Sequence, residues 1–210
     1  MMGKLKVEKR VLGMIHTNVY LAVNTETKEA ILIDPADDAG RLERDIEALD
    51  VKPAGILLTH GHFDHIGAAR ELADAYGIKI GAGSEEADVM ADPAINMSGQ
   101  FTEPFGITAD CLYADGETFF MAGFRIRVIH TPGHTKGGVC YYLPEEGVLF
   151  SGDTLFCGTI GRTDLPTGSM SALVRSVRGL LADLPDETAV YPGHSSDTTI
   201  AYEKEYNSFV

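Results

Sequence analysis

Thr59-His60-Gly61-His62-Phe63-Asp64-His65 is the stretch of this chain that says most about its fold and its chemistry. Three imidazoles and one carboxylate fall within six consecutive positions, and such groups are costly to pack together unless they bind a cation. In an extended segment His60 and His62 project to the same side, whereas Asp64 and His65 fall at the expected start of a helix. The run can therefore offer two imidazoles to one metal and a carboxylate with an imidazole to a second.

Three further candidate ligands, His134, Asp153 and His194, lie far downstream. Each of them, like His60, comes directly after a strand-like apolar segment; these segments are residues 56–58, 126–129, 148–150 and 189–191. Because strand ends meet at one edge in α/β folds, we expect the side chains to converge there. A glycine precedes each downstream ligand, which permits unusual φ angles and a close approach of the backbone.

These seven residues predict a site for two divalent metal ions. Asp153 is suited to bridge them, because a carboxylate has two oxygens. Neutral imidazoles and carboxylates favour zinc, and iron and manganese also accept this donor set.

Hydrophobic periodicity predicts alternating strands and helices. Strands are expected at 19–23, 30–33, 54–59, 78–80, 119–121, 124–129, 139–143, 148–150 and 189–191, with helices at 39–49, 66–76, 169–184 and 198–206. Residues 92–115 show little periodicity and are expected to form a long loop. Hairpins mixed with helices predict α/β layers. No Pro/Gly/Ser linker divides the chain, so residues 1–210 are interpreted as one domain.

Composition excludes several classes of function. The net charge of −14, from 17 Lys+Arg against 31 Asp+Glu, argues against nucleic acid as a partner. Three cysteines give no disulfide framework and favour a reducing cytoplasm. Residues 1–10 lack the apolar segment of a signal peptide, and no apolar run is long enough to span a membrane. A cytoplasmic protein acting on a small-molecule substrate is expected, and the oligomeric state stays open.

The ordered motifs resemble those of the metallo-β-lactamase superfamily. They are the run from His60 to His65, Thr131-Pro132-Gly133-His134-Thr135, Ser151-Gly152-Asp153-Thr154-Leu155-Phe156 and Pro192-Gly193-His194. The resemblance covers nearly the full chain. It implies an α+β fold, an αββα four-layer sandwich with two mixed sheets face to face and helices outside.

The resemblance also implies a ligand set. A first metal would be held by His60, His62, His134 and Asp153. A second would be held by Asp64, His65, His194 and the same Asp153.

Departures from the family pattern narrow the branch. True β-lactamases of this fold lack the bridging Asp after a Ser-Gly pair, so Asp153 argues against them. Flavodiiron proteins carry Glu at the position of His62, and RNA-processing members carry extra domains. What remains resembles glyoxalase II, the hydroxyacylglutathione hydrolase. Only 16 residues follow His194, which resembles the compact single-domain bacterial hydrolases of this group rather than the forms with a helical C-terminal domain.

This branch implies metal-dependent thioester hydrolysis of S-acylglutathione-type substrates. Two cations would share a water and lower its pKa toward about 7. One would polarise the thioester carbonyl and stabilise the oxyanion. Asp64 would be a ligand that also orients the hydroxide.

Alternatives remain open at this point. Gly161-Arg162-Thr163-Asp164 also resembles persulfide dioxygenases, in which His60, His134 and Asp153 would hold a single iron. A lactonase suits the same centre, and a metal-binding protein without turnover is a third class. Arg162 is a candidate for binding a substrate carboxylate, or else for a loop-fixing pair with Asp164. Phe156 is expected in the core rather than in the wall of the site, and His130 either supports a ligand or is an ordinary polar residue.

Overall fold

Two six-stranded sheets dominate this computed structural model, which describes residues 4–209. The first has the order β1-β2-β3-β4-β5-β6, antiparallel as far as β3 and parallel from β3 to β6. Its strands are β1 (Leu5–Leu12), β2 (Thr17–Asn24), β3 (Glu29–Ile33), β4 (Lys52–Leu57), β5 (Ile80–Gly83) and β6 (Cys111–Tyr113).

The second sheet has the order β14-β13-β10-β9-β8-β7 and is antiparallel except for the parallel pair β10–β13. Its strands are β7 (Thr118–Met121), β8 (Phe124–His130), β9 (Val139–Leu143), β10 (Val148–Gly152), β13 (Ala189–Pro192) and β14 (Thr198–Thr199). A short hairpin of β11 (Leu155–Phe156) and β12 (Thr159–Ile160) follows β10.

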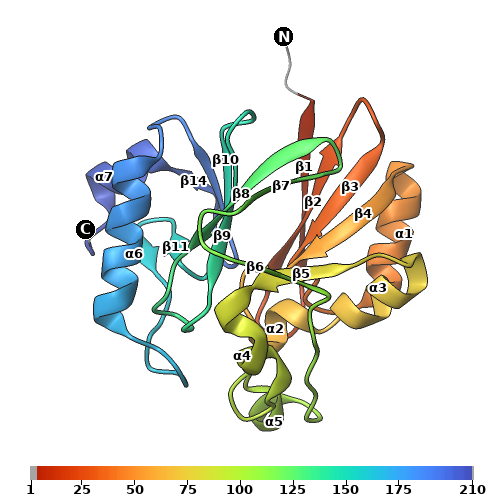
Figure 1. Ribbon diagram of the computed structural model, residues 1–210, viewed down its shortest axis with the longest axis horizontal. Coiled ribbons are helices and arrows are strands. Elements are labelled where there is room, and N and C mark those ends of the chain that lie inside the picture. Colours follow the sequence, from red (N-terminus) through yellow and green to blue (C-terminus); the bar gives the residue numbers. More distant parts are fainter. Residues whose placement is uncertain (1–3, 210) are drawn as a thin grey trace.

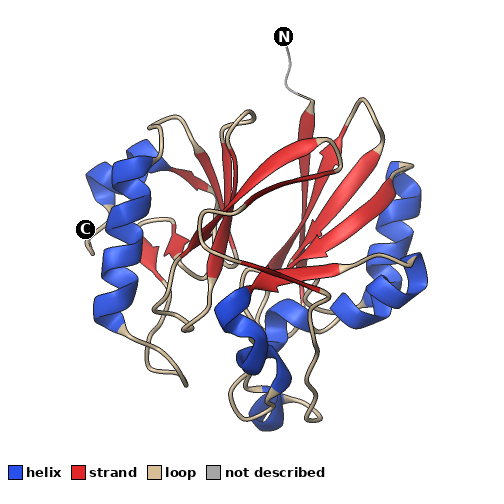
Figure 2. Cartoon of the chain, in the orientation of Figure 1, coloured by secondary structure: helices blue, strands red, loops and turns tan. Residues whose placement is uncertain are grey.

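Helices cover the outer faces of both sheets (Figures 1 and 2). The helices are α1 (Ala39–Leu49), α2 (Phe63–Ile66), α3 (Ala69–Tyr76), α4 (Ala87–Ala91), α5 (Ser98–Phe101), α6 (Met170–Asp183) and α7 (Ile200–Tyr206), with a 3₁₀ turn at Ser84–Glu86. In Figure 1, α1 and α3 flank the first sheet, and α6 and α7 flank the second. None of the helices in the described part of the chain has the length and apolar character needed to cross a membrane.

Three apolar clusters hold the layers together. Strand β2 shows how, because its alternate residues face opposite sides. Val19 and Leu21 pack with α1 and α3, whereas Tyr20 faces the second sheet and joins the cluster of Tyr141 and Phe150. A third cluster joins the outer face of the second sheet to α6. The predicted αββα sandwich with two mixed sheets is therefore confirmed. The one-domain interpretation stays a prediction, which the core shared between the sheets supports.

Several element predictions are confirmed and others only in part. Helix α1 matches the predicted 39–49, and the helix predicted over 169–184 is α6. The helix predicted over 66–76 is confirmed from residue 69 onward as α3, but its first turn is wrong, because residues 67 and 68 form a turn that separates α3 from α2. At this turn, Ala68 N–H donates to Pro35 O at 2.9 Å. A side chain on Gly67 would overlap the carbonyl oxygen of Ala36, so the backbones touch there.

The long loop predicted over 92–115 is confirmed only in part, because α5 and the edge strand β6 interrupt it. Buried Asn96 fixes this segment through its side chain. Its Nδ2 donates to Met90 O at 3.2 Å and to Phe105 O at 2.8 Å, and its Oδ1 accepts from Ser98 N–H at 2.8 Å. Side-chain hydrogen bonds of this kind leave no periodic signal. The three cysteines are free, as the composition led us to expect.

Candidate metal centre

The predicted ligands lie where strands of both sheets end. His60 follows β4, and His62 caps the N-terminus of α2, so Asp64 and His65 fall in its first turn. His134 follows β8, Asp153 follows β10 and His194 follows β13, all in the second sheet. The expected convergence of strand ends is therefore present, and it joins the two sheets.

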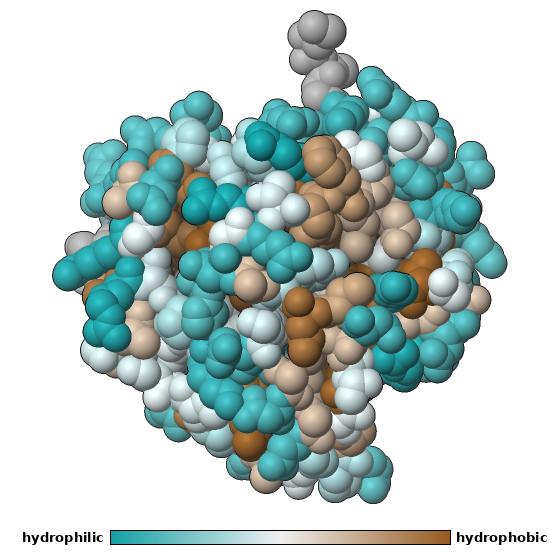
Figure 3. Space-filling view, in the orientation of Figure 1, coloured by the Kyte–Doolittle hydropathy of each residue, from teal (hydrophilic) through white to brown (hydrophobic). Residues whose placement is uncertain are grey.

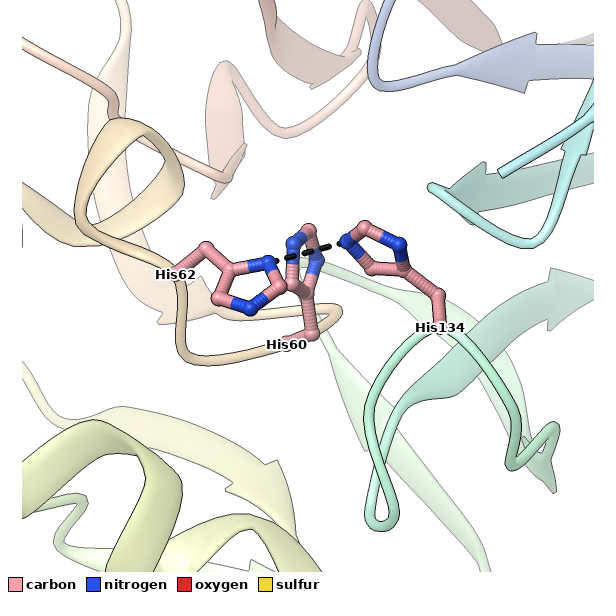
Figure 4. Close-up of side chains that lie close together, drawn as sticks. All are labelled: His60, His62 and His134. Carbon is pink, nitrogen blue, oxygen red and sulfur yellow. Dashed lines mark hydrogen bonds between the residues drawn. The ribbon is translucent and has the colours of Figure 1, made fainter. Parts of the chain in front are cut away.

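The first donor group is made of imidazoles alone. His60, His62 and His134 offer ring nitrogens that all lie within 4.8 Å of one another. His62 Nδ1 is 2.9 Å from His134 Nε2, and the three ring centroids are 4.7 to 4.8 Å apart. Figure 4 shows His60 and His62 on one loop and His134 facing them from another. Such an arrangement suits one tetrahedral cation with a further ligand.

The second donor group mixes imidazoles with a carboxylate. Atoms of Asp64, His65 and His194 also lie within 4.8 Å of one another. Asp64 Oδ2 is 3.3 Å from His194 Nε2 and 3.4 Å from His65 Nε2. Thr17 Oγ1 donates to the same Asp64 oxygen at 2.8 Å and fixes its direction.

Asp153 lies between the two groups. Its Oδ2 is 3.5 Å from His134 Nε2 and 3.6 Å from His194 Nε2, while its Oδ1 is 3.5 Å from His65 Nε2. One carboxylate therefore faces donors of both groups. The structure thus brings all seven predicted side chains together.

Unpaired polar atoms show that these residues fit cations. Within residues 4–209, His60 Nε2, His62 Nε2, His65 Nε2 and Asp153 Oδ1 are buried and have no hydrogen-bond partner. Buried polar atoms are nearly always paired. Imidazole nitrogens and carboxylate oxygens are the donors that zinc and iron accept, so the donor set fits two divalent metal ions.

The two groups differ in charge. Burial lowers the pKa of His62 to about 3, and His134 adds to the effect. Burial likewise holds the pKa of His60 well below its ordinary value, so His60 and His62 are both neutral. Burial also opposes protonation of His65, but Asp64, Asp153 and Asp34 outweigh it and raise the pKa of His65 to about 10.

Asp34 is a residue of the site that sequence reasoning missed. Its Oδ2 accepts from His65 Nδ1 at 2.9 Å and from Thr59 Oγ1 at 2.6 Å, and its Oδ1 accepts from Thr59 N–H at 2.7 Å. Thr59 Oγ1 is in turn 3.2 Å from His60 Nδ1. Through this chain one buried carboxylate directs the Nε2 atoms of both imidazoles toward the centre. In the sequence, Asp34-Pro35 indicates only the end of a strand. The available signal for a role in the site was that Asp34 follows β3, the neighbour of the strand that leads to His60.

Glu86 is a second missed residue, and it is fully buried. Its Oε1 accepts from Gly61 N–H at 2.8 Å, and its Oε2 accepts from Gly137 N–H at 2.9 Å and from Thr135 Oγ1 at 3.0 Å. Burial raises the pKa of Glu86 to about 7, against these three hydrogen bonds. Glu86 thus ties the loop of His60 and His62 to the loop that follows His134.

Two of the three glycines that precede ligands have backbone angles that other residues rarely adopt. Gly133 has φ +139° and Gly152 has φ +49°, both in the region that favours glycine. A side chain on Gly133 would overlap the backbone of Leu173, and one on Gly152 would overlap Thr59. The turns before His134 and Asp153 therefore depend on glycine.

A cavity of about 410 Å³ opens beside the two donor groups. Phe156 lines it and meets His194 edge-on, with ring centroids 6.1 Å apart, so the expected core role of Phe156 is wrong. Arg162 lines it too, but its guanidinium donates to both oxygens of Asp164 at 2.8 Å. The loop-fixing pair is thus the contact present, and carboxylate binding by Arg162 stays a prediction. His130 belongs to neither donor group and bonds to Lys136 O at 3.0 Å.

Known proteins resemble this chain in sequence. The sequence model of the metallo-β-lactamase superfamily matches residues 12–194. Hydroxyacylglutathione hydrolase GloC of Haemophilus influenzae is 38% identical over 191 residues, covering 88% of this chain and 89% of that protein.

Solved structures agree in fold. BLEG-1 B3 metallo-β-lactamase superposes with a TM-score of 0.92 at 40% identity, covering 97% of this chain and 99% of that one. TTHA1623 in a di-iron-bound form superposes with a TM-score of 0.85 at 36% identity, covering 97% of this chain and 100% of that one. ETHE1 from Myxococcus xanthus superposes with a TM-score of 0.78 at 30% identity, covering 97% of this chain and 83% of that one. The sequence argument against β-lactamases is therefore not confirmed, because a protein of that name is among these neighbours.

Proposed function

The chain belongs to the metallo-β-lactamase superfamily as a metal-dependent hydrolase, and on that premise we propose that it hydrolyses thioesters of the S-acylglutathione type. The observation that carries the proposal is the convergence of two donor groups on one carboxylate, Asp153. The similarity to GloC supports this choice of substrate.

The proposed roles follow from the contacts. His60, His62, His134 and Asp153 hold one divalent cation, and Asp64, His65, His194 and Asp153 hold the other. Such a pair of cations supplies an activated water and polarises a carbonyl oxygen. Thr17 holds the Asp64 carboxylate in place, so that Asp64 can also orient the attacking water.

The second donor group favours a hydrolase over the alternative dioxygenase. A single iron held by His60, His134 and Asp153 would leave Asp64, His65 and His194 without a role, although they converge as closely as the first group. Oxygen uptake with persulfide and a content of one iron per chain would establish the dioxygenase. Zinc is the proposed metal, and the di-iron form of TTHA1623 keeps iron as the alternative; elemental analysis distinguishes them.

β-Lactam hydrolysis is the second candidate function. The similarity to BLEG-1 favours it, and a lactam or lactone carbonyl suits the same activated water. A panel of a chromogenic cephalosporin, a lactone and a thioester ranks the three activities on one preparation.

The direct test is hydrolysis of S-D-lactoylglutathione by purified protein. We expect turnover that a chelator abolishes and that added metal restores. Asp153→Ala should lose at least about a thousandfold in kcat, because both donor groups lose a shared ligand. His130→Ala is the matched control, since His130 lies in neither group, and it should keep full activity. Full activity in Asp153→Ala would refute the site.

A further inference from the structure

The walls of the cavity beside the donor groups are strongly apolar. Its lining includes Ile15, Phe63, Met97, Phe101, Ile160 and Leu165. Phe101 and Ile15, which both line it, keep 47% and 42% of their surface exposed. Apolar surface gathered in a concave site is typical of ligand recognition.

The apolar wall is fixed rather than loose. Phe63 of α2 and Phe101 of α5 stack with ring centroids 5.4 Å apart and planes inclined by 18°. Buried Ser98, at the start of α5, donates through Oγ to Phe105 O at 2.8 Å and accepts from Phe105 N–H at 3.0 Å. A wall anchored in this way is organised before a ligand arrives, which lowers the entropic cost of binding.

Charged groups are scarce in the same cavity. Asp64 and Asp153 belong to the donor groups, and Arg162 is the single lysine or arginine among the described lining residues. Its Nε and Nη2 donate to Asp164, so the guanidinium is already paired with a carboxylate. The cavity therefore offers little to a polar or charged group, and much to an aliphatic or aromatic one.

We propose that the preferred thioester carries an apolar acyl group, aliphatic or aromatic, which packs against Phe63, Phe101 and Leu165 while its carbonyl faces the donor groups. This inference rests on the proposed thioesterase function and goes beyond it, because lactoyl is a small hydroxylated acyl group. The thiol portion then extends out of the cavity, where no apolar wall is required.

The first experiment varies the acyl chain on one thiol. With S-acetyl-, S-butyryl- and S-hexanoylglutathione, kcat/KM should rise about fourfold per methylene, since each fully buried CH₂ contributes about 0.8 kcal/mol. S-D-lactoylglutathione should be slower than S-butyrylglutathione. A flat series, or lactoyl as the fastest substrate, overturns the inference and leaves the thioesterase function intact. A rise that follows an alkyl group on the thiol, at constant acetyl, overturns it as well.

Variants locate the effect in the cavity wall. Phe101→Ala should reduce the hexanoyl-to-acetyl ratio of kcat/KM about tenfold, because the longer chain loses more contact with the wall than acetyl does. Leu165→Ser, in a half-buried loop position, should act in the same direction and guards against a folding defect in the first variant. Phe120→Ala is the matched control, because Phe120 is 72% exposed but does not line the cavity. It lies on β7, where apolar side chains also gather on the surface in Figure 3. An unchanged ratio in both wall variants refutes the assignment.

A binding experiment separates the inference from the proposed function. If no thioester is cleaved, the proposed function fails, and the non-hydrolysable thioethers S-methyl- and S-hexylglutathione decide the rest by calorimetry. We expect tighter binding of the hexyl compound, at least about tenfold, and loss of that difference in Phe101→Ala. Equal affinities for the two thioethers overturn the apolar cavity itself.

Discussion

Replacing Asp34 by asparagine should weaken both cation sites, because Asp34 bonds to His65 directly and to His60 through Thr59. The substitution is nearly isosteric, and asparagine accepts the φ of +49° at this position as readily as aspartate does. The backbone N–H of Thr59 cannot reverse its polarity, so the amide oxygen must stay opposite it, where Oδ1 now accepts at 2.7 Å. The new NH₂ group then faces His65 Nδ1, which is 2.9 Å from the present Oδ2.

The imidazole of His65 must adapt to that donor. A lone pair on Nδ1 places the proton on Nε2, the atom that faces Asp64 and Asp153. An Nε2–H cannot bind a metal, so each binding event must first restore the unfavourable tautomer. Loss of such a supporting partner costs about 10- to 100-fold in metal affinity, which is about 1.4 to 2.8 kcal/mol.

Competition with a chelating indicator measures the two affinities separately. Both equivalents of zinc should bind about 10- to 100-fold more weakly to Asp34→Asn than to the unchanged protein. Asp37→Asn is the control, because Asp37 is exposed and its side chain accepts from Asp38 N–H, which asparagine also does. If both equivalents bind within twofold of the unchanged protein, Asp34 does not set the tautomer of His65.

Four further predictions concern stability, protons and metal. In Glu86→Gln the NH₂ group must face one of the backbone N–H donors, of Gly61 or of Gly137. The free energy of unfolding in urea should fall by about 2 kcal/mol, whereas Glu85→Gln, at an exposed position, should change it little. Gly161→Ala puts a methyl group against the carbonyl oxygen of Asp153 and should cost about 1 to 3 kcal/mol; Gly179→Ala, in an open helical position, should instead stabilise by about 0.5 to 1 kcal/mol. The pKa of His65 is raised to about 10, so the metal-free protein keeps the imidazole protonated at pH 8. Metal binding should release that proton, as calorimetry in buffers of different ionisation enthalpy will show, and metal affinity should rise with pH up to about 10. Chelation should lower the free energy of unfolding by about 2.7 kcal/mol for each metal that had stood at a hundred times its Kd.

The donor set was predictable because its residue types are distinctive and lie at strand ends. The first helix was predictable for a similar reason: Leu42 and Ile46 recur at helical spacing and are both buried in α1. Strand β1 was not predicted, because it is an edge strand in which Lys9 interrupts the apolar face of Leu5, Val7 and Val11. Charges of this kind protect an edge from aggregation and remove the signal for a strand.

The supporting residues were hidden for a different reason. Asp34 acts on Thr59 and His65, which are 25 and 31 positions away, and Glu86 acts on Gly61 and Thr135 across 25 and 49 positions. Such contacts exist only after the strands have taken their places in the sheets. A single carboxylate in the sequence gives no sign of a partner that distant.

Metal binding and the packing of the two sheets must be thermodynamically coupled in this protein. The first sheet and its loops carry His60 and His62, and the second carries His134, so neither half holds a complete donor group. The bonds around the centre also cross between the sheets, for Tyr20 Oη donates to Pro192 O at 2.7 Å and Asn18 N–H donates to Gly193 O at 2.7 Å. Any cation that binds only the assembled groups stabilises the assembled sheets by the same free energy. The site is therefore part of what holds the sandwich closed, and substitutions at the sheet-to-sheet bonds should weaken metal binding without touching a ligand.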